Sequence, residues 1–165
     1  MEYIVGIAVV AAVVGGVLWN HRTKAAAFAG VGFEVPLPPG QVVAVISAVY
    51  CQGAKAAVRN TFSGVSVRRE GPAEFVFETR LGDTGEIRIT AADEAGSTVE
   101  AEATSLYIGG VLLFESGSPI WQLSKNLTHL IYRMLGLAPY AARMKRFQYA
   151  LERKVTHQIH RQIQA

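Results

Sequence analysis

The chain has only one cysteine, Cys51, and it has no motif typical of a metal or nucleotide enzyme. One cysteine cannot form an internal disulfide, which is typical of a domain in a reducing compartment, and we expect Cys51 to be a small buried side chain. His157 and His160 are three residues apart, but no Cys, Asp or further His lies near them. No glycine-rich phosphate loop is present. We therefore expect no metal, no cofactor and no catalytic residue.

Charge is also absent from the seventeen residues between Tyr3 and Trp19, whereas Arg22 and Lys24 follow directly. This run makes about 26 Å of helix, near the lower limit for crossing a bilayer core. A cleaved signal peptide would carry its basic residues before the apolar run, and a buried core helix would have a polar stripe. We interpret residues 1–24 as an uncleaved single-pass anchor with a basic flank. The positive-inside rule then predicts a cell-membrane protein with its N-terminus outside and its main domain cytoplasmic.

Acidic residues are scarce in the last third of the chain. Residues 66–116 contain ten acidic and four basic side chains, whereas residues 117–165 contain eight basic side chains and one acidic one. The two regions could attract each other within the domain. Alternatively, the basic region could lie against anionic lipid, where each Lys or Arg contributes about 1 kcal/mol.

The sequence after residue 24 predicts a short connector over 25–30 and one α+β domain over 31–165. Residues 32–37 resemble a strand that ends near a proline, and residues 41–50 and 54–62 have helical spacing. From Val65 the apolar period changes to two, with turns between successive runs. This alternation predicts antiparallel strands with one apolar face and one charged face.

Three further segments complete the chain. Residues 106–114 are apolar on both faces and predict a tight hairpin. Residues 118–136 predict a helix with an apolar stripe that ends at Gly136. A second helix begins near Pro139, and its apolar positions are three or four residues apart as far as Ile163.

The element order (a strand, two helices, an antiparallel meander and a long C-terminal helix) resembles the helix-grip fold of the START/Bet v1/polyketide-cyclase superfamily. The resemblance covers about residues 31–163. It rests on the strand-to-helix segment FEVPLPPGQVV at 33–43, the hairpins GDTGEIR at 82–88 and AGSTVE at 95–100, and the helix at 139–163. It implies a cavity between the sheet and the long helix, which in this superfamily holds lipids, sterols or polyketide-like molecules. It carries over no catalytic residue.

Two sets of candidate site residues follow. The apolar positions of the strands and the last helix would line the cavity or simply pack together; they are Phe75, Phe77, Ile87, Ile89, Val99, Ala101, Phe147 and Leu151. The basic positions next to the anchor would face the membrane surface; they are Arg22, Lys24, Arg143, Lys145 and Arg146.

We therefore expect a membrane-anchored domain that binds membrane lipid or another hydrophobic small molecule. The second hypothesis is a non-catalytic accessory or scaffold subunit that docks on a membrane-protein partner through residues 106–114 and 118–136. A cyclase-type enzyme ranks last. Nucleic acid ranks below lipid as a partner of the basic helix, because the apolar face of that helix is as continuous as its basic face.

Overall fold

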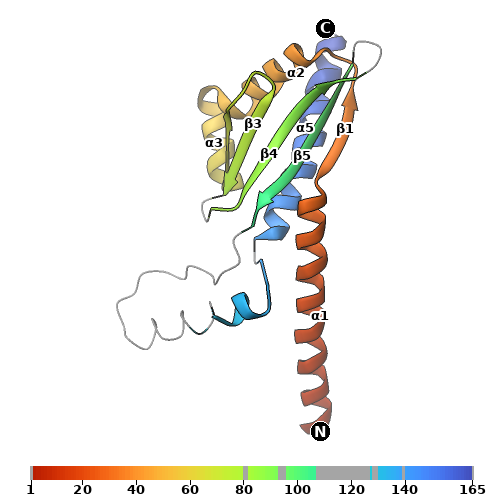
Figure 1. Cartoon of the computed structure of the whole chain (residues 1–165), viewed down its shortest axis with the longest axis vertical. Helices are drawn as coiled ribbons and strands as arrows, with labels where there is room; N and C mark the ends of the chain where they lie inside the picture. Colours follow the sequence, from red (N-terminus) through yellow and green to blue (C-terminus); the bar gives the residue numbers. More distant parts are fainter. Residues whose placement is uncertain are drawn as a thin grey trace, which may run out of the picture.

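The computed structural model has an α+β architecture: a long apolar N-terminal helix, a five-stranded antiparallel sheet and a C-terminal helix (Figure 1). The N-terminal helix, α1, comprises Glu2–Ala29, and the C-terminal helix, α5, comprises Ala141–Ile163. The structure describes residues 2–79, 82–92, 96–106, 127, 130–138 and 140–164.

The sheet has the order β1-β5-β4-β3-β2, so the first strand of the chain lies beside the last. Its members are β1 (Val31–Val35), β2 (Val65–Arg69), β3 (Glu74–Thr79), β4 (Thr84–Ala91) and β5 (Ser97–Ser105). Every neighbouring pair is antiparallel, with Phe33 opposite Val99 and Phe75 opposite Ile87. The predicted alternation is confirmed, because apolar side chains on one face are buried and the glutamates on the other face are not.

Between β1 and β2 the chain forms α2 (Pro39–Ile46), a π-helical turn η1 (Ser47–Cys51) and α3 (Gly53–Ser63). Proline is accommodated at the start of α2 because the first turn of a helix needs no backbone donor there. At the end of α3, Gly64 has a φ of 66°, and its N–H donates to the carbonyl of Asn60 over 2.9 Å. The two predicted helices are therefore confirmed.

The core lies between one face of the sheet and the helices α2 and α5. The strands contribute Phe75 and Phe77, and α5 contributes Phe147 and Leu151. The rings of Phe77 and Phe147 have centroids 4.8 Å apart, and Tyr50 meets Phe147 edge-on at 5.6 Å. The long helix predicted from Pro139 is confirmed as α5, which begins at Ala141.

Helix α1 continues through residues 25–29, where the sequence predicted a connector. Alanine is the best helix former, and Ala27 is fully buried against the core, so both propensity and packing extend the helix. The helix ends at Ala29, and the φ of 71° at Gly30 allows the turn into β1. Helix α1 and the first strand are thus separated by a single residue.

The predicted 106–114 hairpin lies outside the described residues apart from Leu106, which is buried. The same holds for most of the predicted 118–136 helix, of which Leu127 and residues 130–134 are described and helical. The helix ends at Gly136 as predicted: Gly136 has a φ of 61° and its N–H donates to Arg133, while the N–H of Leu137 donates to Tyr132.

Candidate functional site

The segment Val5–Ala29 is long and apolar enough to span a membrane, and its length and composition also fit a signal sequence. Its first part makes no tertiary packing with the other described residues: Val10 is 63% exposed and Trp19 is 60% exposed. From Asn20 onward the same helix contacts α5 and β5. Helix α1 therefore has an unpacked apolar part and a part that belongs to the folded domain.

Asn20 makes the first connection between these two parts. Its Nδ2 donates to the carbonyl of Ala138 over 3.0 Å, and its Oδ1 accepts from the N–H of Ala138 over 2.9 Å. One amide side chain thus satisfies both backbone groups of a residue in the turn before α5. This geometry fixes the height and rotation of α1 against that turn.

Three more contacts extend the connection. Lys24 Nζ donates to the carbonyl of Gly136 over 3.3 Å, and His21 Nε2 lies 3.1 Å from the carbonyl of Leu135. At the end of α1, Nε2 of the buried Gln148 donates to the carbonyl of Ala27 over 2.8 Å. The last carbonyls of a helix have no partner within the helix. Here side chains of α1 reach the carbonyls of Leu135 and Gly136, and Gln148 of α5 reaches a carbonyl at the end of α1. We call residues 20–27, 135–138 and 148 the anchor junction.

The eight predicted cavity residues all lie in one hydrophobic core. Each of Phe75, Phe77, Ile87, Ile89, Val99, Ala101, Phe147 and Leu151 is at most 5% exposed. They contact one another from the sheet and from α5, as the Phe77–Phe147 ring pair illustrates. None of them lines the three surface pockets described below.

The five predicted membrane-surface basic residues come from two helices that pack side by side. Arg22 and Lys24 lie in α1 just after its unpacked part, and Arg143, Lys145 and Arg146 lie in the first two turns of α5 (Figure 1). The Arg143 guanidinium lies 5.3 Å from the ring centroid of Tyr140. All except Lys24 and Lys145 are well exposed, and Lys24 is held in the anchor junction.

The outer face of the sheet carries six of the nine acidic residues that the structure describes between residues 31 and 164. Glu86 and Glu102 are directly opposite each other on β4 and β5, and Arg88 bridges them at 2.5 Å and 3.1 Å. The hydrogen bond that Arg88 donates to Glu86 and the negative charge of Glu86 raise the pKa of Arg88. The glutamates of this acidic face are Glu34, Glu74, Glu78, Glu86, Glu100 and Glu102. Because α5 covers the opposite face, the sheet separates these carboxylates from the basic residues of α5.

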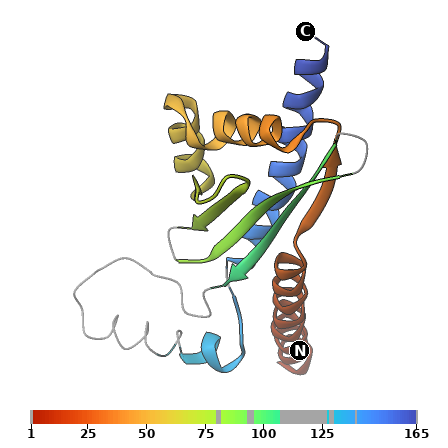
Figure 2. The same ribbon diagram turned by 45° about the horizontal axis from the view of Figure 1, so that its top comes forward.

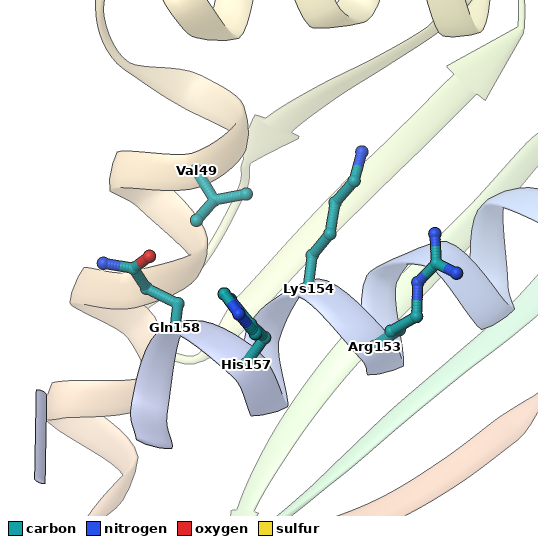
Figure 3. A pocket seen from close by; sticks show the side chains of 5 residues that line it. All are labelled: Val49, Arg153, Lys154, His157 and Gln158. Carbon is teal, nitrogen blue, oxygen red and sulfur yellow. The ribbon is translucent and has the colours of Figure 1, made fainter. Parts of the chain in front are cut away.

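A basic groove lies between η1 and the second half of α5 (Figure 3). It has a volume of about 330 Å³, and its lining residues are Val49, Arg153, Lys154, His157 and Gln158. A shallow depression of about 820 Å³ adjoins it along α2 and shares Val49 and Gln158. A third pocket, of about 390 Å³, lies at the β2–β3 edge beside Asn60 and Thr79. No sequence motif indicated these pockets, because their lining residues come from distant segments.

The histidines and Cys51 are the remaining candidate groups. Within the described residues, no group of three His, Cys, Asp or Glu side chains could hold a metal ion. Cys51 is exposed, which corrects the prediction that it is buried, because the π-helical turn η1 ends there and directs it beside β2. Its Sγ lies 3.5 Å from the carbonyl of Val67, and desolvation raises the pKa of the thiol against the opposing effect of Arg69.

Comparison of the chain with protein-family models, with curated proteins and with solved structures finds no match.

Proposed function

We propose that this chain is a single-pass membrane protein whose domain acts as a non-catalytic accessory or scaffold subunit on the cytoplasmic side. The observation that carries this proposal is the anchor junction. Asn20, Lys24 and Gln148 tie the apolar helix to the turn before α5 and to α5 itself. A domain held at a fixed height and rotation above a bilayer is suited to presenting one face to a neighbouring membrane protein.

The same contacts support a retained anchor over a cleaved signal peptide. Residues 25–27 have the small side chains that a cleavage site requires. Cleavage there would remove both hydrogen bonds of Asn20 and the contact of Lys24, and it would end the helix inside the core beside Ala27. The basic residues Arg22 and Lys24 favour a cytoplasmic position for the domain.

The acidic face supports the choice of docking surface. Its six glutamates outnumber its arginines, and within the described residues no helix covers it. Figure 2 shows α2 and α5 on the other side of the sheet. We propose that this face docks on a basic surface of a membrane-protein partner, because opposite charges steer association and select the partner.

A second candidate is the binding of a hydrophobic ligand by a helix-grip-like domain. The pairing of β1 with β5 and the position of α5 across the sheet support a relation to the START/Bet v1 superfamily. However, a ligand between the sheet and α5 would have to displace Phe77 from Phe147. Native mass spectrometry after mild extraction tests this candidate, and a bound lipid at stoichiometric level would favour it over the scaffold.

Photocrosslinking in intact membranes tests the scaffold proposal. A benzophenone amino acid replaces Thr90 or Thr104 at exposed positions on β4 and β5, and Gln162 at the end of α5 is the matched control. We expect adducts with one second protein from the two strand positions and none from the control. Glu100→Lys combined with Glu102→Lys should abolish the adduct. Purely monomeric migration from both strand positions would contradict the proposal.

The topology has its own tests. The intact mass of the membrane-extracted protein should include residues 1–24. A maleimide that cannot cross membranes should label Cys51 only after the cells are opened, since Cys51 is exposed in the domain. Loss of the first residues, or labelling of intact cells, would contradict the anchored cytoplasmic arrangement.

A further inference from the structure

An apolar stripe in the segment before α5 faces away from the protein core. Leu127, Leu130, Ile131 and Met134 follow helical spacing, and Met134 is 77% exposed. With Leu135, which is 44% exposed, they form what we call the lower stripe. Soluble proteins rarely leave contiguous apolar patches of large side chains in water, so such a patch marks an interaction site.

The anchor junction fixes where the lower stripe lies. The helical turn that carries it ends at Leu135 and Gly136, whose carbonyls are bonded to His21 and Lys24. The stripe is therefore held at the point where α1 changes from packed to unpacked, next to Trp19. In Figures 1 and 2 the light-blue helical residues 130–134 lie below the sheet, on the same side as the unpacked part of α1.

We propose that Leu127 and residues 130–135 form a second membrane contact, in which the lower stripe enters the inner leaflet beside α1. This inference rests on the proposed membrane anchoring. If the unpacked part of α1 spans the bilayer, then residues tied to His21 and Lys24 lie at the headgroup level. Amphipathic helices at this depth bury their apolar face about 5–10 Å into the boundary between headgroups and acyl chains.

Charge supports lipid as the occupant of the lower stripe. Arg133 belongs to the same turn, and Arg22 and Arg146 are exposed on the helices next to it. Basic side chains around an apolar stripe fit the anionic headgroups of a cytoplasmic leaflet. The unpacked span is also short, since seventeen uncharged residues make about 26 Å of helix against a core of about 30 Å. A helix lying among the headgroups would help the bilayer to thin around that span.

Depth-dependent fluorescence quenching tests the inference on the full-length protein. In a Cys51→Ser background, Met134→Cys is labelled with the dye NBD. The protein is reconstituted into vesicles of equal parts phosphatidylcholine and phosphatidylglycerol, with or without lipids that carry a doxyl quencher. Ile131→Cys is a second test position. Val13→Cys in the span and Gln158→Cys on α5 are the controls, and equal thermal midpoints verify that all variants are folded.

We expect the doxyl lipids to reduce the fluorescence at positions 131, 134 and 13 about twofold or more, and to leave position 158 unchanged. Quenching at 13 without quenching at 131 and 134 would overturn the inference while leaving the anchor intact. A blue-shifted dye at 134 that doxyl lipids do not quench would indicate a protein occupant, either a second copy or a partner, and would also overturn it. Absence of quenching at 13 would refute the anchoring and the inference together.

Discussion

Replacement of Gly30 by alanine should loosen the connection between α1 and the sheet. Gly30 has a φ of 71°, and a Cβ built there would lie 2.6 Å from the backbone oxygen of Ala101 and 3.0 Å from Cβ of Glu102. The left-handed conformation costs an alanine about 1–2 kcal/mol, and a contact this close to backbone adds about 1–3 kcal/mol. We expect Gly30→Ala to lower the free energy of unfolding by about 2–5 kcal/mol.

The matched control is Gly53→Ala. Gly53 has a φ of 77°, but a Cβ there would meet nothing within 4 Å. This variant should lose only the conformational part, about 1–2 kcal/mol. Thermal unfolding in detergent micelles, followed by circular dichroism, measures both variants, and 1 kcal/mol corresponds to about 2–4 °C for a chain of this length. Hydrogen exchange should rise in Val31–Val35 for Gly30→Ala alone. Equal losses in the two variants, with β1 still protected, would refute the reasoning.

Three further predictions concern the core, the anchor junction and the thiol. Gly85→Ala places a Cβ against the ring of Phe77 and the backbone of β5, so thermal unfolding should show a loss of about 1–3 kcal/mol or more, and an unchanged midpoint would contradict this. Gln148→Met removes the side chain that donates to the carbonyl of Ala27 in α1, and it should lower the free energy of unfolding by about 1–3 kcal/mol. Gln148→Glu leaves a buried carboxylate without a donor and should cost about 3–5 kcal/mol at neutral pH. Burial raises the pKa of that carboxyl in the folded state above its pKa in the unfolded chain. The loss in free energy of unfolding should therefore shrink as the pH falls towards the pKa of the unfolded chain. Urea titrations measure this loss at each pH, and a loss that does not depend on pH would argue against the reasoning. Iodoacetamide should alkylate Cys51 with a pH midpoint above that of a free thiol, because desolvation raises the pKa of Cys51. Arg69→Ala should move this midpoint higher still, because the charge of Arg69 lowers the pKa. A midpoint equal to that of a free thiol, and unchanged by Arg69→Ala, would count against both effects.

The sheet was predictable because each strand has only one apolar face. In β3, Phe75 and Phe77 are buried while Glu74 and Glu78 are exposed, and a period of two in the sequence identifies both the strand and its inner face. The end of a helix at Gly136 was predictable for a similarly local reason, since glycine readily adopts the left-handed conformation.

The features missed are those that depend on distant segments. Residues 25–29 contain helix-forming alanines, but only the burial of Ala27 against the core shows that α1 continues without a break. The pairing of Asn20 with Ala138 joins positions 118 residues apart, and no local pattern indicates it. Alternation also assigns residues such as Ile87 to the inner face without indicating whether that interior is filled or hollow, because this depends on the volumes of side chains from every element.

The long separation between the partners of the anchor junction has a consequence for biogenesis. Gln148 is 121 residues beyond Ala27, and β1 must wait for β5 to be synthesised before it can pair. At a synthesis rate of about 5–20 residues per second, α1 leaves the ribosome roughly 6–24 s before Gln148 does. Until then the carbonyl of Ala27 lacks the side chain that donates to it. The apolar helix is therefore synthesised as an isolated segment, and under the proposed anchoring it would enter the membrane before the domain assembles around its end.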